Sequence, residues 1–167
     1  MPTFIYPKFA PWFEALCAHL DMKGDEFAFA RENGGVIVAG TPVFVGVPAV
    51  GADDHVLLQA VVGPLPEPPH RTPLLERVLQ WQMLVCGPAA CMFGFEPSQQ
   101  NLLLMRTVEP DRLPAADAAM MVRSLALLAV QWVRLLQDPD LLARPDPAFA
   151  RAGIGEWGRS LQRRSPG

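Results

Sequence analysis

Cysteine, clustered basic residues and long apolar runs are all scarce in this 167-residue sequence. The three cysteines show no C-x-x-C spacing, which argues against a disulfide framework and fits reduced thiols in a reducing compartment. The formal net charge is −3, and no run of Lys or Arg interrupts the first 137 residues. Nucleic acid and anionic membrane surfaces are therefore not expected partners, because both call for a basic face.

Signals for export and membrane insertion are also missing. The N-terminus has no charged segment followed by an apolar core and a small-residue cleavage site. The most apolar part of the C-terminal half is interrupted by Asp117, Arg123 and Arg134, so it falls short of the roughly 18 uninterrupted residues of a membrane span. We expect a cytoplasmic protein that does not insert into a membrane.

Catalytic motifs are equally sparse. The four serines include none in a G-x-S-x-G elbow, and the three histidines lie far apart in the chain without metal-ligand spacing. Residues 153–158 match G-x-G-x-x-G, but a proline-rich segment precedes them where a strand would be needed. Cys86 and Cys91 flank a Gly-Pro corner and are expected to be structural, since buried cysteines behave as small hydrophobes. We expect no catalytic residue, cofactor or metal.

The hydrophobic periodicity predicts an α+β fold with the element order α-βββ-α-ββ-α, in which an antiparallel sheet packs against helices as a sandwich. Asn33-Gly34 is the strongest hairpin signal, because it supplies the positive φ angles of a tight turn. Whether residues 36–47 form one bent strand or two short ones stays open. The predicted elements are a helix at 11–20, strands at 26–31, 36–47 and 56–62, a helix at 72–86, strands at 89–96 and 101–108, and a helix at 113–137. Residues 1–138 are expected to form one domain, and the proline- and arginine-rich residues 139–167 a flexible tail.

The predicted central helix, residues 72–86, is more apolar than one packing partner requires. Its apolar positions cover roughly 200° of the helix surface, against about 100° for an ordinary surface helix. We expect the side that carries Val78 to pack on the sheet of the same chain and the side from Leu79 to Met83 to meet a second protein. Gln82 lies near the junction, where a buried amide needs a hydrogen-bond partner from the preceding crossover, the second hairpin or a second copy of the helix.

Around this helix, GPLP precedes LLERVLQWQML, and GPAACMFGFEPSQQNLLLMRTV and a leucine-rich helix follow. Over roughly residues 9–137, this pattern resembles the class I chaperones of bacterial type III secretion, the Tir-chaperone family. In that family an asparagine is common at the place that Gln82 occupies here.

The resemblance implies a homodimer without enzymatic activity in the bacterial cytoplasm, which binds the N-terminal segment of a secreted effector. A secretion ATPase is a further partner that the resemblance allows. By the family pattern, the predicted dimer interface contains Leu75, Leu79, Trp81, Gln82 and Met83. Helix 11–20 and the first three strands would bind the client, through Phe13, Leu16, Phe27, Phe29, Val43 and Val45.

Two other functional classes stay open on the sequence alone. One is a small α+β enzyme or ligand-binding protein that uses Cys86 or Cys91 as a nucleophile. The other is a dimeric adaptor that docks a folded partner.

Overall fold

A computed structural model describes residues 7–48, 54–84 and 91–138 of the chain. The fold is built on one antiparallel five-stranded sheet with the strand order β1-β2-β3-β5-β4. A short 3₁₀ turn, η1 (Pro7–Phe9), precedes the first helix. The helices are α1 (Ala10–His19), α2 (Gly24–Asn33), α3 (Arg71–Leu84) and α4 (Ala115–Gln137), and the strands are β1 (Gly35–Val38), β2 (Thr41–Gly46), β3 (Val56–Pro64), β4 (Met92–Glu96) and β5 (Asn101–Val108). The predicted α+β class is confirmed, with one helix more than expected.

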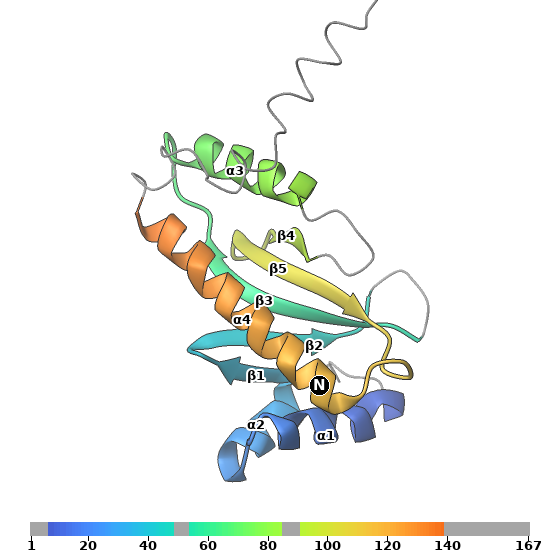
Figure 1. Ribbon diagram of the computed structural model, residues 1–167. Coiled ribbons are helices and arrows are strands. Elements are labelled where there is room, and N and C mark those ends of the chain that lie inside the picture. The colour runs from blue at the N-terminus through green and yellow to red at the C-terminus, as the bar shows by residue number, and fades with distance from the viewer. Residues whose placement is uncertain (1–6, 49–53, 85–90, 139–167) are drawn as a thin grey trace, which may run out of the picture.

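The long helix α4 crosses one face of the sheet, with α1 packed beside it (Figure 1). Strand β3 alternates strictly between buried and half-buried residues, and its buried positions join the core with one face of α4. Alanines at buried positions of α4, such as Ala126 and Ala129, let the helix backbone approach the sheet closely. By length and composition alone α4 could cross a membrane, but its buried face is that of a core helix.

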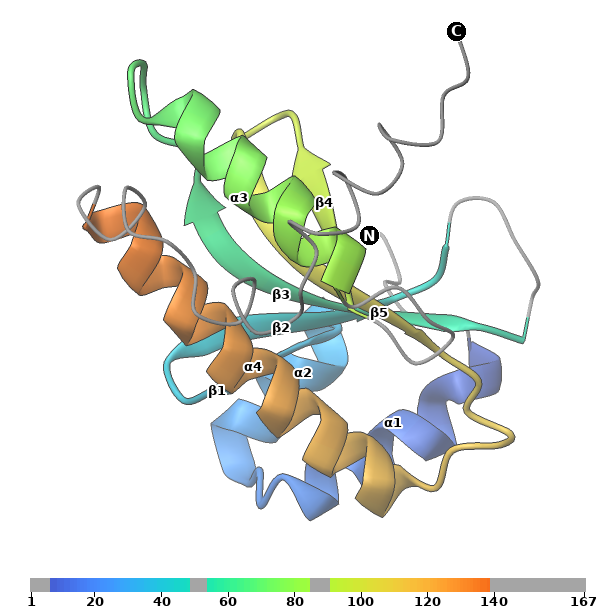
Figure 2. The same ribbon diagram turned by 45° about the horizontal axis from the view of Figure 1, so that its top comes forward.

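The two ends of the strand order carry different helices. Helix α3 lies beside the edge strand β4, whereas α2 lies beside the other edge strand, β1 (Figure 2). The opposite face of the sheet is only half buried and is mainly apolar, with Phe44, Leu57, Val61, Leu103 and Met105.

The prediction of a strand at residues 26–31 is wrong, because these residues belong to α2. The Asn33-Gly34 pair ends this helix instead of closing a hairpin: Gly34 has a left-handed φ of 64° and donates its N–H to the carbonyl oxygen of Ala30. Asp25 and Glu26 stabilise the first turn through the helix dipole. Positive φ serves both a helix C-terminus and a tight hairpin turn, which is why the pair misled the prediction.

The first hairpin instead turns at Ala39-Gly40, between β1 and β2. Both residues have positive φ, at 51° and 77°, and Val38 pairs with Thr41 across the two-residue loop. This is the geometry of a type I′ turn. Residues 36–47 therefore contain two strands. Pro42 is tolerated in β2 because pairing with β3 begins only at Val43.

The remaining predicted elements are confirmed. The central helix α3 begins at Arg71, and the second hairpin pairs β4 with β5 in antiparallel register. Helix α4 ends at Gln137, as the periodicity indicated. Cys86 and the predicted tail at 139–167 lie outside the described residues.

Candidate functional site: two apolar surfaces at the sheet edges

Gln82 fixes α3 against the edge strand β4. Its side-chain oxygen accepts the N–H of Phe93 at 2.9 Å, and its side-chain nitrogen donates to the carbonyl oxygen of Cys91 at 3.4 Å. The amide thus pairs with the second hairpin, one of the three partners that the sequence left open. A polar side chain at this place fixes the register of helix and strand, because sliding α3 would leave both backbone groups unpaired.

Aromatic stacking supports the same contact. The rings of Trp81, Phe93 and Trp132 pack edge to face, with centroids 4.6 to 6.0 Å apart. Trp132 belongs to α4, so this aromatic cluster joins α3, β4 and α4. Leu74 and Val78 complete the buried side of α3. The predicted packing of the Val78 side on this chain's own sheet and helix is confirmed.

The other side of α3 is exposed and apolar. Leu79 and Met83 have 66% and 65% of their surface exposed, and Leu75 is also exposed. On the neighbouring strand β4, Met92 and Phe95 are exposed too. We call the exposed residues Leu75, Leu79 and Met83 of α3, together with the edge strand β4 beside them, the α3–β4 surface; Met92 and Phe95 lie on opposite faces of that strand. Of the predicted dimer residues, Trp81 and Gln82 are half buried and already engaged within the chain, so Leu75, Leu79 and Met83 are the ones that present an outward contact.

Four of the six predicted client-binding residues do not face outward. Phe13, Leu16, Val43 and Val45 are each at most 2% exposed and belong to the core. We correct their assignment: they support α1 and β2 from inside and cannot contact a partner in this conformation. Sequence cannot separate a core apolar residue from a surface one when the element is apolar on both faces.

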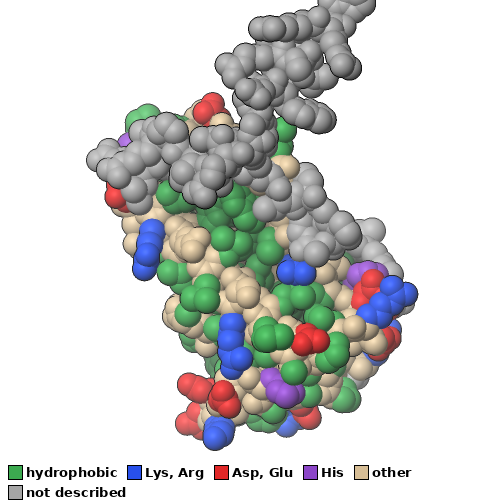
Figure 3. Space-filling model, viewed as in Figure 1, with side chains coloured by type: hydrophobic (Ala, Val, Ile, Leu, Met, Phe, Trp, Pro, Cys, Tyr) green, Lys and Arg blue, Asp and Glu red, His purple; other side chains and the backbone are tan. Residues whose placement is uncertain are grey.

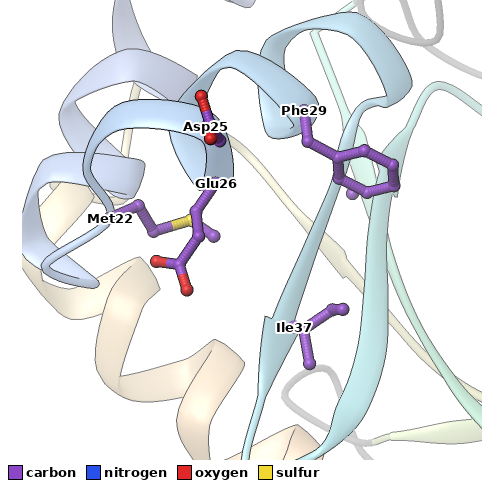
Figure 4. Close-up of a pocket in the computed structure, with 6 residues that line it drawn as sticks. Met22, Asp25, Glu26, Phe29 and Ile37 are labelled. Atoms are coloured by element: carbon purple, nitrogen blue, oxygen red, sulfur yellow. The ribbon is translucent and has the colours of Figure 1, made fainter.

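The other two predicted client residues lie on α2. Phe27 is half buried, whereas Phe29 is 52% exposed and lines a pocket between α2 and β1. The pocket has a volume of about 310 Å³, and its other lining residues are Met22, Asp25, Glu26, Gly35 and Ile37. The close-up shows Phe29 from α2 and Ile37 from β1, with Met22, Asp25 and Glu26 beside them (Figure 4). We call these six residues the α2–β1 pocket.

The position of the α2–β1 pocket matters because β1 is an edge strand. Ile37, in the middle of β1, is 63% exposed. An edge strand with an apolar neighbour offers both backbone hydrogen bonds and side-chain contacts to an extended chain. The sequence missed Met22 and Ile37 because it placed a strand where α2 lies.

The rim of the α2–β1 pocket is acidic. Asp25 and Glu26 are exposed, and among the described residues neither forms an ion pair or a side-chain hydrogen bond. Arg31, also on α2, is engaged with other groups, since its guanidinium pairs with Glu14 of α1 at 3.3 Å and lies over the ring of Phe27. The pocket therefore combines apolar walls with two carboxylates that form no ion pair among the described residues.

Besides the α3–β4 surface and the α2–β1 pocket, two exposed apolar residues lie on the outer face of α4. Met120 and Leu127, two turns apart, are 58% and 57% exposed. This face also carries Arg123, which donates to the carbonyl oxygen of His19 at 2.9 Å. In the space-filling view, apolar side chains on this side of the molecule are interspersed with charged ones (Figure 3). Separated in this way, Met120 and Leu127 are ordinary surface residues and serve below as controls.

The cysteine chemistry does not support a nucleophile at Cys91 or Cys17. Burial raises the pKa of the Cys17 thiol to about 11, and burial also raises the pKa of Cys91. A reactive thiol needs the opposite shift, because the thiolate is the nucleophile. Within the described ranges, no group of three or more His, Cys, Asp or Glu side chains could hold a metal ion.

The polar residues just before β3 interact with the end of β5. The ring of His55 lies 2.7 Å from the carboxylate of Asp54 and 3.7 Å from that of Glu109, which follows β5. Glu109 in turn pairs with Arg112 at 3.0 Å. These groups join two loops at one end of the sheet and show no catalytic arrangement.

Fold and surfaces together define an α+β protein whose described cysteines are buried or half buried and which has apolar surfaces at both edges of its sheet. Residues 14–133 match the sequence model of the Tir chaperone protein (CesT) family, and the chain belongs to this family. The resemblance seen in the sequence is thereby confirmed. No curated protein matches the chain in sequence.

Solved structures share the fold at low sequence identity. The type III secretion chaperone SycH of Yersinia pestis, bound to a fragment of YscM2, is 12% identical with a TM-score of 0.53, over 74% of this chain and 98% of that one. The match to the HopA1–SchA chaperone–effector complex has 14% sequence identity and a TM-score of 0.51, and it covers 75% of this chain and 93% of that one. The match to the ExoT–SpcS complex of Pseudomonas aeruginosa has 15% sequence identity and a TM-score of 0.51, and it covers 76% of this chain and 98% of that one.

Proposed function

We propose that this protein is a type III secretion chaperone, which binds the N-terminal segment of a secreted effector in the bacterial cytoplasm and keeps it competent for secretion. Membership of the Tir chaperone family supports this role. Two of the structures that share its fold are a chaperone bound to a fragment of YscM2 and a chaperone–effector complex. Delivery of the client to a secretion ATPase is part of the same proposal.

The single observation that carries the proposal is the α2–β1 pocket beside the edge strand β1. An extended client can add to β1 through backbone hydrogen bonds and place an apolar side chain between Phe29 and Ile37. Binding of this kind orders a client that has no fold of its own, and a large buried apolar surface offsets the cost of that ordering.

A homodimer is the second part of the proposal, and the α3–β4 surface supports it. Exposed Leu75, Leu79 and Met83 form an apolar stripe at spacing i, i+4, i+8 on α3. Exposed apolar stripes of this kind mark contacts with other proteins. Because the α3–β4 surface and the α2–β1 pocket lie at opposite edges of the sheet, a dimer formed through α3 would leave both pockets open.

The role that we propose involves no enzymatic step. An enzyme that uses Cys91 is disfavoured by the burial that raises the pKa of its thiol. A dimeric adaptor would bind a folded partner, and the pocket beside a free strand edge favours an extended one instead.

The test uses the full-length chain and an effector that copurifies with it from the native host. Truncations of that effector should show that its N-terminal segment is sufficient for binding. Ile37→Asp should weaken the complex at least tenfold, because it places a charge in the apolar pocket, whereas Met120→Asp, at a residue of similar exposure on α4, should leave binding unchanged. Binding that requires folded effector domains alone would refute the chaperone role.

A further inference from the structure

The α2–β1 pocket has features that suit one particular segment of this chain. Its walls are apolar, through Met22, Phe29 and Ile37, and its rim carries Asp25 and Glu26 without a compensating cation among the described residues. A matching occupant would combine a large apolar side chain with nearby positive charge.

Residues 139–167 have this composition. They contain five arginines against three acidic residues, in contrast to the acidic chain as a whole. The sequence IGEWGRSLQRR at 154–164 contains the apolar residues Ile154, Trp157 and Leu161 and three arginines, Arg159, Arg163 and Arg164, against one acidic residue, Glu156. Aromatic and aliphatic anchors beside arginines are the residue types that carry most of the energy in protein interfaces.

This segment is an addition to the family fold. The family match ends at residue 133, and the three structures described above cover only about three quarters of this chain although they match nearly along their whole length. The segment is also long enough. Twenty residues separate Gln137 from Trp157, and at about 3.3 Å per extended residue they reach roughly 65 Å, more than the breadth of about 40 Å expected for a compact domain of this size.

We propose that the C-terminal segment 154–164 occupies the α2–β1 pocket of its own chain when no client is bound. Trp157 enters between Phe29 and Ile37, and the arginines that follow lie against Asp25 and Glu26. The segment then acts as an internal competitor, which covers an exposed apolar pocket until a client displaces it. The inference rests on the proposed function in one respect only, namely that clients use the same pocket.

Competition of this kind has a chemical consequence for clients. A client that displaces the segment must supply the same combination, an apolar anchor followed by Arg or Lys. A client segment with acidic residues at these positions would meet Asp25 and Glu26 and bind poorly, since like charges at an interface disfavour association.

Hydrogen–deuterium exchange of the full-length chain, read by mass spectrometry, tests the proposal without a client. Amides at 154–164 should exchange at least fivefold more slowly in the wild type than in Ile37→Asp. The triple variant R159E/R163E/R164E should lose the same protection, and it leaves the described fold untouched. Leu127→Asp, a charge at an equally exposed residue outside the pocket, should retain wild-type protection.

A charge swap makes the test specific. Glu26→Lys alone should accelerate exchange at 154–164, and Glu26→Lys combined with R159E/R163E/R164E should restore at least half of the lost protection. Thermal unfolding of Glu26→Lys checks that α2 survives the loss of a helix-stabilising carboxylate. Equal exchange of 154–164 in the wild type, Ile37→Asp and the triple variant would overturn the proposal. Protection that disappears on tenfold dilution would also overturn it, by assigning the segment to a second copy.

The two proposals fail separately. If 154–164 exchanges freely while effector binding still depends on Ile37, the internal competitor is refuted and the chaperone role stands. If 154–164 is protected and no effector N-terminus binds the full-length chain, the chaperone role fails and the docking of the segment stands.

Discussion

At the scale of single residues, Gln82 does what no apolar side chain at its position could do. It pairs with two backbone groups of the segment that leads into β4, and so it determines where α3 sits on the sheet edge. From the resemblance seen in the sequence, an asparagine is expected at the place that Gln82 occupies. Both side chains end in an amide, which offers an acceptor and a donor together, as this contact requires.

The first prediction concerns Gln82→Leu. The substitution leaves the N–H of Phe93 without its partner in a partly buried place, so it should lower the free energy of unfolding by roughly 1–3 kcal/mol. Gln80→Leu, an exposed position on the same helix, is the matched control and should change stability by less than about 0.5 kcal/mol. Urea unfolding followed by circular dichroism measures both. Equal effects of the two variants would show that the Gln82 contact is dispensable.

At Ala39, the backbone conformation affects stability more than the side chain does. Its φ of 51° lies in the left-handed region, which costs a non-glycine residue roughly 1–2 kcal/mol. Ala39→Gly should therefore stabilise the chain by about 0.5–1 kcal/mol, after the greater freedom of glycine in the unfolded chain is subtracted. Ala28→Gly, at an exposed position inside α2, should destabilise by about the same amount. Thermal unfolding gives the sign: a loss of stability in Ala39→Gly would contradict the turn geometry.

At the scale of elements, the hairpin of β4 and β5 is closed by a carboxylate. Glu96 accepts hydrogen bonds from the hydroxyl and the N–H of Ser98 and from the N–H of Gln99, the two N–H groups at 2.8 and 2.9 Å. The Ser98 hydroxyl and these backbone donors favour the charged form and lower the pKa of Glu96. Because the folded pKa lies below the unfolded one, the contribution to stability is present above the unfolded value and is lost as the pH falls through the folded value.

The corresponding prediction compares the wild type with Glu96→Gln across pH. At about pH 7 the wild type should be the more stable, and the difference should shrink and then vanish as the pH falls through the folded pKa of Glu96, which lies below its unfolded value. Urea unfolding at a series of pH values measures it. Glu76→Gln, at an exposed position on α3, should follow the wild type throughout. A difference that persists unchanged into acid would mean that shape, and not charge, makes the Glu96 contact.

The elements also show how far the sequence alone reaches. Strands β3, β4 and β5 and the helices α1, α3 and α4 follow from hydrophobic periodicity and from proline and glycine boundaries, whereas the division of residues 36–47 into β1 and β2 was left open. Helix α2 does not, because Phe27 and Phe29 are two residues apart as in a strand and Asn33-Gly34 suits a turn as well as a helix end. The true turn at Ala39-Gly40 carries no comparable signal, since alanine rarely adopts positive φ.

At the predicted client site, the sequence did not separate exposed apolar residues from buried ones. Near α1 and β2, the apolar residues chosen from the sequence are the ones that fill the core, and the exposed Ile37 was overlooked. Which side chains are exposed depends on which elements pack together. Predicting a strand in place of α2 therefore gave the wrong exposure for the residues of the neighbouring elements as well. On α3, Leu75, Leu79 and Met83 are exposed, in line with the excess of apolar residues seen in the sequence. This excess could be recognised because it depends on the sequence of one helix alone.

At the scale of the whole molecule, the sheet separates two surfaces that would otherwise compete. The α3–β4 surface lies at one edge and the α2–β1 pocket at the other, with β2, β3 and β5 between them. An apolar residue on either surface raises the tendency to self-associate, and the net negative charge of the chain opposes unspecific association. A dimer through α3 would cover one surface permanently and leave the other for transient use.

The last prediction tests that division with Leu79→Asp. If α3 forms the dimer contact, a charge at the centre of its apolar stripe should yield a monomer, because an unpaired carboxylate cannot be buried between two protomers. Leu127→Asp provides the control, since Leu127 is a similarly exposed leucine in another long helix, α4, and that variant should remain dimeric. Light scattering coupled to size-exclusion chromatography gives the mass of each variant. A Leu79→Asp dimer would move the interface away from α3, whereas a wild-type monomer would leave the α3–β4 surface free for a different protein.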